Sequence, residues 1–188
     1  MGRMMVSARF VLRGYFCRRR TGKRFESPTF LSCKTLCVTE EQMNHTQEIQ
    51  DLFDILHDGY IDAYRETSGY VEFKIGIQYL AELFHEGGEV LYLEIQDLEY
   101  LNFTPWSEDH SAITDIETIV NLELGILNCD YQNNGFHIHC SCDETQHGFT
   151  GGTLTVNFRK FNVKDETGKT ITLNNLRKVA NKYWDELD

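Results

Sequence analysis

The stretch from Phe136 to His147, FHIHCSCDETQH, concentrates the side chains of this sequence that are best suited to chemistry. It holds three histidines, two cysteines, an aspartate and a glutamate within twelve residues. Imidazole, thiolate and carboxylate groups are the usual ligands of Zn²⁺, and paired thiols can carry redox chemistry. The stretch therefore raises three hypotheses: a metal site, a redox pair, or an ordinary β-strand.

The alternation of apolar and polar residues favours the strand. Side chains of a strand point alternately to its two faces. The predicted core face consists of Phe136, Ile138, Cys140 and Cys142. The predicted polar face consists of His137, His139 and Ser141. This assignment explains all seven residues without a metal, because cysteine packs in a core like a small hydrophobic residue.

A metal site would have to draw its ligands from one face. His137 and His139 could bind together, with His147 or Asp143 joining them from the turn that follows. Zinc normally takes three or four ligands, so the sequence predicts no metal and no cofactor. If a metal is bound, the candidate ligands are His137, His139 and His147.

A redox role is disfavoured by spacing. Cys140 and Cys142 would lie about 7 Å apart along a strand, which is too far for a relaxed disulfide. A C-x-C pair on a strand also lacks the helix N-terminus that activates C-x-x-C pairs.

Other catalytic patterns are weaker still. His57 and Asp58 could act as a base and its orienting acid, but adjacent residues are expected to point apart, and Asp-Gly favours a turn. There is no G-x-S-x-G elbow and no P-loop, and HEGGE (residues 85–89) lacks the second histidine of a zincin. Gly151-Gly152 is predicted to be a tight turn. We therefore predict a protein without catalytic residues, not an enzyme.

The elements that must position these residues follow from periodicity. Ile49, Leu52, Phe53 and Leu56 mark one face of a short helix, capped by Asn44 or Thr46. Period-two alternation predicts about six strands, with hairpin turns at Ser68-Gly69 and at residues 133–135. A second helical stripe, capped by Thr172, runs to Tyr183 and Trp184. The predicted class is α+β: an antiparallel sheet of about six strands, a short N-terminal helix, and a C-terminal helix packed on one face.

Charge divides the chain into two segments. Residues 1–42 carry nine Lys/Arg and three acids, and residues 43–188 carry nine Lys/Arg and 26 acids. We predict a basic leader over 1–42, outside the native fold, and an acidic domain over 43–188. The leader has the composition of a mitochondrial targeting segment, and RRRTGKR also resembles a nucleic-acid patch. Translation from Met43, with the leader a product of an upstream start, explains the same features.

The net charge of −17 over residues 43–188 bears on partners. An acidic surface attracts basic proteins and repels phosphates, so a basic protein partner is expected and nucleic-acid binding by 43–188 is not. An acidic surface also keeps a cytosolic protein soluble, which is the simpler explanation. No stretch approaches the roughly 18 apolar residues of a membrane span. The six cysteines are read as reduced thiols of a cytoplasmic, bacterial-type protein.

Several short motifs in order carry a resemblance to known proteins: LHDGYI, YLAELF, LNFTPW, GGTLTV, DETGKTITL and YWDEL. Over roughly Ile49 to Leu187 the chain resembles small uncharacterised bacterial α+β domains. Some of these are similar to immunity proteins of polymorphic toxin systems. The resemblance implies a non-catalytic protein-binding module that neutralises a basic toxin. The alternative is a metal-dependent enzyme or zinc-binding protein that uses His137, His139 and His147.

Overall fold

The structure is a computed structural model that describes residues 40–133 and 135–186. The compact unit to which they belong spans Val38–Asp188. The predicted leader lies outside the described residues except for residues 40–42, which form the start of the first helix. The thiols Cys17, Cys33 and Cys37 lie outside them as well, so the interpretations of the leader stay predictions.

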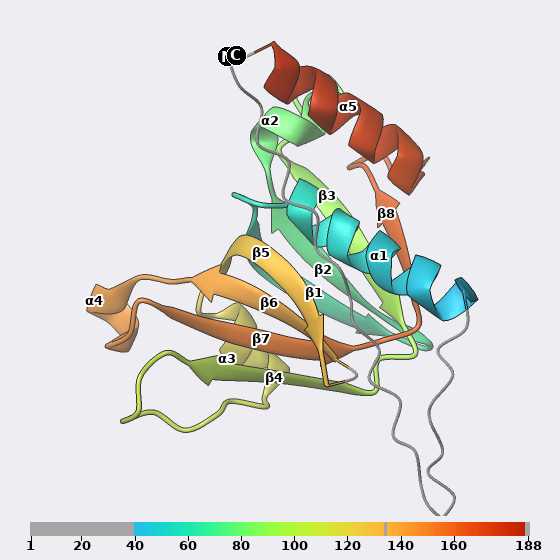
Figure 1. The fold of residues 1–188 in the computed structure, drawn as a ribbon. Coiled ribbons are helices and arrows are strands. Elements are labelled where there is room, and N and C mark those ends of the chain that lie inside the picture. The colour runs from blue at the N-terminus through green and yellow to red at the C-terminus, as the bar shows by residue number, and fades with distance from the viewer. Residues whose placement is uncertain (1–39, 134, 187–188) are drawn as a thin grey trace, which may run out of the picture. The chain divides into compact units, whose positions relative to one another are not determined.

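The described residues form five helices and nine strands (Figure 1). The helices are α1 (Glu40–Ile55), α2 (Gln78–Ala81), α3 (Ile116–Val120), α4 (Glu144–His147) and α5 (Leu173–Asp185). The strands are β1 (Tyr60–Thr67), β2 (Tyr70–Gly76), β3 (Val90–Gln96), β4 (Tyr100–Pro105), β5 (Gly125–Gln132), β6 (Gly135–Ser141), β7 (Gly151–Asn157), β8 (Lys160–Lys164) and β9 (Thr170–Ile171).

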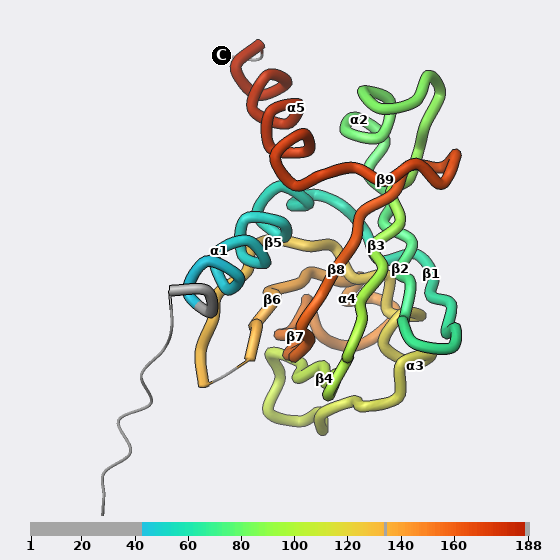
Figure 2. Tube along the Cα trace, turned by 90° about the vertical axis from the view of Figure 1, so that its right-hand side faces the viewer, coloured from blue at the N-terminus to red at the C-terminus, as the bar shows by residue number. Residues whose placement is uncertain are grey.

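All nine strands belong to one antiparallel sheet with the order β4-β7-β6-β5-β1-β2-β3-β8-β9. Its middle is narrow, because β1 and β5 pair in register only at Tyr60 and Gly125. The backbone bonds from Ile61 N to Leu124 O (3.0 Å) and from Ile126 N to Gly59 O (2.8 Å) complete this junction. The sheet therefore has two parts, β4-β7-β6-β5 and β1-β2-β3-β8-β9. The strands of one part run in a different direction from those of the other (Figures 1 and 2).

One hydrophobic core joins both parts of the sheet to the helices. The predicted stripe of α1 is confirmed, since Ile49, Leu52, Phe53 and Leu56 are all buried in this core. The helix packs on β5 and on α5. It begins at Glu40, so the predicted cap at Asn44 or Thr46 was wrong and both residues lie inside the helix.

The predicted fold class was wrong. The molecule is mostly sheet, with nine strands and five short helices among the described residues, and it is not an α+β arrangement of about six strands. The sequence reasoning missed β4, β8 and β9. Strand β9 has two residues, which is too short for a period to be recognised. Strand β4 ends in proline and mixes polar residues among its apolar ones, so pairing with β7 decides its conformation.

The prediction for the C-terminal helix was also wrong in its packing. Thr172 does cap α5, accepting a hydrogen bond from Asn175 N at 3.3 Å. The helix, however, contacts α1 and α2. In Figure 2 it rises away from the strands, and the ring of Trp184 at its far end stacks on His57. Tyr183 stacks on Tyr79 with ring centroids 4.8 Å apart.

Both predicted hairpins are confirmed. Thr67 pairs with Tyr70 across Ser68-Gly69, where Gly69 takes φ 110°. Gln132 pairs with Gly135 in the hairpin that joins β5 and β6. Asn133 adopts φ 50° there, a left-handed conformation that asparagine tolerates better than most residues.

Candidate functional site

The strand β6 shows the alternation that the sequence predicts. Phe136, Ile138 and Cys140 are buried in the core. His137 and His139 are half-buried and lie on the opposite face. The pleat therefore places the Cys140 thiol in the core and the two imidazoles on the accessible face. Cys142, predicted on the core face, lies just after the end of β6 and is only partly buried.

The thiols are poorly suited to reaction. Cys129, Cys140 and Cys142 are free. Burial raises the pKa of Cys129 to about 12 and that of Cys140 to about 12. Burial also raises the pKa of Cys142. A thiolate is the reactive form of cysteine, so these three side chains stay as unreactive thiols at neutral pH.

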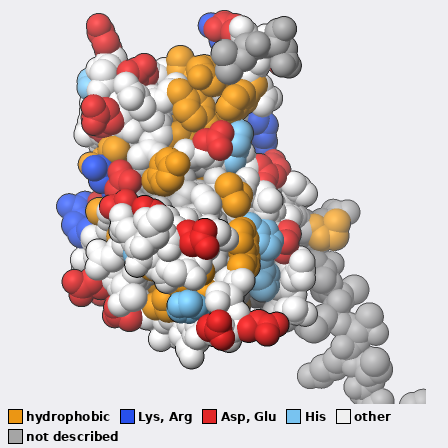
Figure 3. Space-filling view, turned by 90° about the vertical axis from the view of Figure 1, so that its left-hand side faces the viewer, with side chains coloured by type: hydrophobic (Ala, Val, Ile, Leu, Met, Phe, Trp, Pro, Cys, Tyr) orange, Lys and Arg blue, Asp and Glu red, His pale blue; other side chains and the backbone are white. Residues whose placement is uncertain are grey.

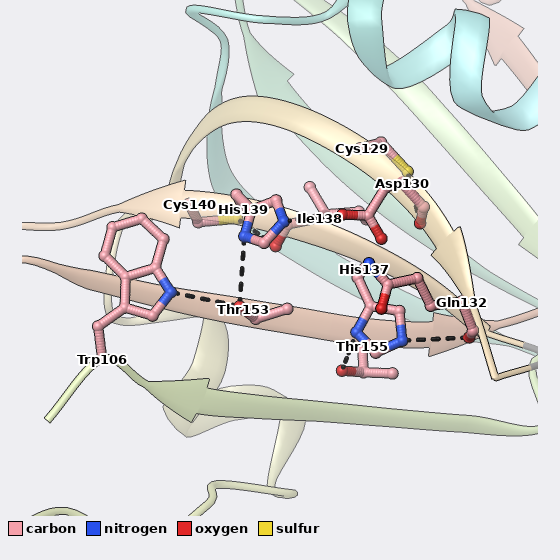
Figure 4. Close-up of polar contacts among 10 residues, drawn as sticks. All are labelled: Trp106, Cys129, Asp130, Gln132, His137, Ile138, His139, Cys140, Thr153 and Thr155. Carbon is pink, nitrogen blue, oxygen red and sulfur yellow. Dashed lines mark hydrogen bonds and ion pairs between the residues drawn. The ribbon is translucent and has the colours of Figure 1, made fainter. Parts of the chain in front are cut away.

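His139 lies in a chain of polar contacts across three strands (Figure 4). Its Nε2 is 3.1 Å from Asp130 Oδ2 on β5, and its Nδ1 is 3.4 Å from Thr153 Oγ1 on β7. The indole of Trp106 donates from Nε1 to the same Thr153 oxygen at 3.3 Å. The simplest proton arrangement has Nε2–H donating to Asp130 and the threonine hydroxyl donating to Nδ1.

His137 repeats this pattern in the next row of the sheet. Its Nε2 is 3.2 Å from the carbonyl oxygen of Gln132, which can only accept a hydrogen bond. Its Nδ1 is 3.5 Å from Thr155 Oγ1, a long contact. Each histidine of β6 thus faces a threonine of β7 in register and has the Nε2–H tautomer in its neutral form. The contacts between imidazole and threonine, at 3.4 and 3.5 Å, are weak hydrogen bonds.

The third predicted ligand, His147, lies in α4, where its ring packs near Phe149 at a centroid distance of 6.0 Å. Asp143 caps α4 by accepting from Thr145 N at 2.8 Å. Hydrogen bonds from Thr145 hold the pKa of Asp143 below its usual value. No three His, Cys, Asp or Glu side chains in the described part of the chain form a group that could hold a metal ion. The predicted set of His137, His139 and His147 is therefore not brought together.

The Gly151-Gly152 pair lies inside β7 and is not the predicted tight turn. A Cβ atom at Gly151 would lie 2.9 Å from Cζ3 of Trp106. A Cβ atom at Gly152 would overlap the ring of Phe103 and lie 2.5 Å from the carbonyl oxygen of Thr104. Glycine is required at both positions because neighbouring groups occupy the space of a side chain.

His57 and Asp58 differ from the sequence expectation. Asp58 takes φ 66°, and this left-handed turn brings its Oδ2 to 3.5 Å from His57 Nε2, although adjacent residues were expected to point apart. His57 Nδ1 contacts the carbonyl oxygen of Asp54 at 2.7 Å. The imidazole also stacks on Trp184 of α5, with ring centroids 5.1 Å apart. His57 thus contacts both α1 and α5, and Asp58 lines a groove.

That groove is the second candidate site, and sequence reasoning missed it. It has a volume of about 710 Å³ and lies between β1, β2, α2 and the start of β3. We call it the acidic groove, because its lining includes four carboxylates and one cation: Asp58, Asp62, Glu82, Glu89 and Lys74. Its four acids are spread over about thirty residues of sequence, so no local motif could have revealed it.

Two tyrosines, Tyr60 and Tyr79, also line the acidic groove. Tyr60 is 53% exposed. Burial, together with the charge of Asp58, raises the pKa of Tyr79 to about 12. Tyr79 therefore stays protonated, and its hydroxyl donates to the carbonyl oxygen of His57 at 3.2 Å. Lys74 is paired with Asp62 at 3.9 Å. The other three carboxylates of the acidic groove have no Lys or Arg partner among the described residues: Asp58 lies 3.5 Å from His57, and Glu82 accepts a hydrogen bond from Gln78.

No helix in the described residues is long and apolar enough to cross a membrane. Comparisons with protein-family models, with curated proteins and with solved structures found no match to this chain.

Proposed function

We propose that residues 43–188 form a non-catalytic binding module for a basic protein, of the kind with which immunity proteins neutralise toxins. The observation that carries the proposal is the acidic groove, which is concave, lined by four carboxylates and one lysine, and bordered by the aromatic rings of Tyr60 and Tyr79. Arginine and lysine side chains bind in such sites through ion pairs and cation–π contacts.

The charge balance of the rest of the domain supports this function. Nine Lys/Arg lie between Met43 and Glu186, and six of them already pair with an acid of the domain. Of the 25 acids in the same described range, nineteen have no Lys or Arg partner there. This surplus produces a negative potential that steers a basic partner toward the surface.

The contacts at the histidines of β6 give less support to an enzyme. The threonine that faces His139 is 3.4 Å from Nδ1, so its hydroxyl is weakly polarised. The buried thiols, with pKa values raised to about 12, do not supply a nucleophile either.

A labelled peptide of alternating lysine and alanine tests the acidic groove directly. We compare a groove variant, Asp58→Asn with Asp62→Asn, Glu82→Gln and Glu89→Gln, with a control variant of equal net charge. The control carries Glu66→Gln, Glu108→Gln, Asp109→Asn and Glu144→Gln, all at exposed positions outside the groove. Fluorescence anisotropy at several salt concentrations gives the Kd of each protein.

We expect salt-sensitive 1:1 binding that the groove variant weakens by about tenfold or more, and the control variant by about threefold or less. Equal weakening in both variants would contradict a localised site. The toxin form of the proposal is tested with basic proteins encoded by genes next to the one for this chain. A stable 1:1 complex that inhibits the partner supports it, and neighbouring genes with no basic toxin-like product contradict it.

A further inference from the structure

The face of β4, β5, β6 and β7 that is turned away from the core differs from the rest of this acidic protein. We call it the polar sheet face. Its strand residues are Tyr100, Asn102, Thr104, Asn128, Asp130, Gln132, His137, His139, Ser141, Thr153, Thr155 and Asn157. Asp130 is the only acid among them and there is no Lys or Arg, although the whole chain has a net charge of −11.

The side chains of this face are aligned in rows by strand pairing. One row across the sheet is Asn128, His139, Thr153 and Thr104. The next row is Asp130, His137, Thr155 and Asn102. Amide, hydroxyl and imidazole groups, together with the carboxylate of Asp130, therefore form a regular array of hydrogen-bond donors and acceptors. Figure 3 shows a group of histidine side chains beside hydrophobic and acidic ones, with no Lys or Arg next to that group in the view.

Trp106 provides a flat aromatic surface at one end of the polar sheet face. Its backbone N–H donates to Gly151 O at 2.9 Å, and its indole Nε1 donates to Thr153 Oγ1 at 3.3 Å. The ring lies against Gly151, where a Cβ atom would be 2.9 Å from Cζ3. One side of the indole is thus held on the sheet, yet the residue is 51% exposed. An immobilised ring with an open side is preorganised for stacking.

Tyr100 has the same arrangement at the other end of β4. Its hydroxyl end lies over Gly135, where a Cβ atom would collide with Tyr100 Oη. The residue is 42% exposed. Trp106 is six positions after Tyr100, which corresponds to about 20 Å along an extended strand. The two rows of polar groups lie between the two rings.

This combination selects one class of ligand. Phosphate-bearing ligands need cations, which the strand residues of the face do not provide, and the acidic protein repels them. A protein partner would need an apolar centre, whereas the two rows between the rings are polar, and Leu127, at the bulge of β5, is the one exposed aliphatic side chain of these four strands. A neutral carbohydrate matches the charge of the face, since its C–H surfaces stack on aromatic rings and its hydroxyls exchange hydrogen bonds with amide, hydroxyl and imidazole groups.

We propose that the polar sheet face binds a neutral oligosaccharide of about four hexose rings, the length that fits a strand span of about 20 Å. Trp106 and Tyr100 stack on sugar rings at the two ends of the ligand. His139 and Thr153, together with their counterparts His137 and Thr155, bind the hydroxyl groups between them. This site uses different strands from the acidic groove, so it stands whether or not a basic protein binds there.

The test uses a panel of neutral tetrasaccharides: cellotetraose, laminaritetraose, maltotetraose, mannotetraose and chitotetraose. Isothermal titration calorimetry with the full chain gives the Kd for each. We expect at least one to bind with a Kd of about 1 mM or tighter, and Trp106→Ala to weaken that binding by about tenfold or more. Trp106→Phe keeps a smaller ring and is expected to bind with intermediate affinity, which separates loss of stacking from loss of folding.

Tyr131→Ala is the matched control, because Tyr131 is also an exposed aromatic residue, but its ring contacts Phe136 on the opposite face of the sheet. Its affinity for the tetrasaccharide is expected to equal that of the unchanged protein. The proposal is overturned if no tetrasaccharide of the panel binds at about 10 mM. It is equally overturned if Trp106→Ala binds as well as the unchanged protein, or if a heparin-derived tetrasaccharide or a single-stranded oligonucleotide binds at Trp106 in preference to the neutral sugars.

Discussion

Glu94 of β3 shows how one buried charge is accommodated in this sheet. Its carboxylate is buried and accepts hydrogen bonds from Asn162 Nδ2 at 2.9 Å and from Lys164 Nζ, both on β8. Burial alone would raise the pKa of Glu94, but Lys164 and Asn162 outweigh that effect and hold the pKa below its usual value. The carboxylate is therefore ionised in the folded protein, and its stabilising contribution is present above the pKa of the unfolded chain.

We expect Lys164→Met to destabilise the fold by about 2 kcal/mol at pH 7, because it leaves the buried carboxylate of Glu94 without its cation. The effect is smaller than for a fully buried pair, since Lys164 is partly screened by solvent. When the pH is lowered below 4.5, the usual pKa of a glutamate, the unchanged protein loses stability as Glu94 becomes protonated. In the variant the carboxyl has no cation, so its pKa rises and the loss of stability on acidification is smaller. The difference between the two proteins should therefore shrink below about pH 4.5.

Urea unfolding followed by circular dichroism at pH 7 and near pH 4 measures this difference. Lys178→Met is the control, since Lys178 is exposed on α5 and should change stability by less than about 0.5 kcal/mol. A difference between Lys164→Met and the unchanged protein that stays constant with pH would contradict the role assigned to Glu94.

At the scale of elements, α5 is held to the domain by a short apolar stripe and by aromatic contacts at its end. Leu176 and Ala180 are buried. Tyr183 and Trp184 contact Tyr79 and His57, which belong to segments far away in the sequence. The amphipathic period of this helix and its cap at Thr172 could be read from the sequence. The elements on which α5 packs could not be predicted, because the sequence of the helix does not show whether its apolar stripe contacts a sheet face or the helices α1 and α2.

We expect Leu176→Ala to lower the free energy of unfolding by about 3 kcal/mol, since it removes a fully buried leucine of the apolar stripe and leaves a cavity. Leu83→Ala is the matched control. Leu83 is 49% exposed, so its truncation should have little effect. Thermal unfolding by calorimetry compares the two variants. A cost for Leu176→Ala close to that for Leu83→Ala would mean that α5 contributes little to the stability of the domain.

At the scale of the whole molecule, the narrow junction between β1 and β5 raises the question of cooperativity. The two parts of the sheet share one register pair and a few backbone bonds. The core, however, is one cluster that includes residues of both parts, such as Phe73 and Leu93 on one side and Ile138 and Leu154 on the other. Burial of shared apolar surface couples the two parts more strongly than the few backbone bonds do.

We expect residues 38–188 to unfold in one two-state transition, with calorimetric and van't Hoff enthalpies that agree. Tryptophan fluorescence should follow the same transition as far-ultraviolet circular dichroism. Trp106 reports on the β4-β7-β6-β5 part, and Trp184 reports on the contact of α5 with His57. Two separate transitions, or probes that do not coincide, would show that the two parts of the sheet fold independently.

The sequence by itself determined the features that depend on neighbours along the chain. It predicted the two faces of β6, the buried stripe of α1, both hairpins and the cap of α5, because strand and helix periods and turn preferences are local properties. Only the tertiary structure decided the rest. Strand pairing made a strand of β4, brought Thr153 and Asp130 to His139, and placed Trp106 over Gly151 where a tight turn was expected. The acidic groove likewise exists only because β1, β2, α2 and β3 meet, so its four carboxylates leave no signature in the sequence.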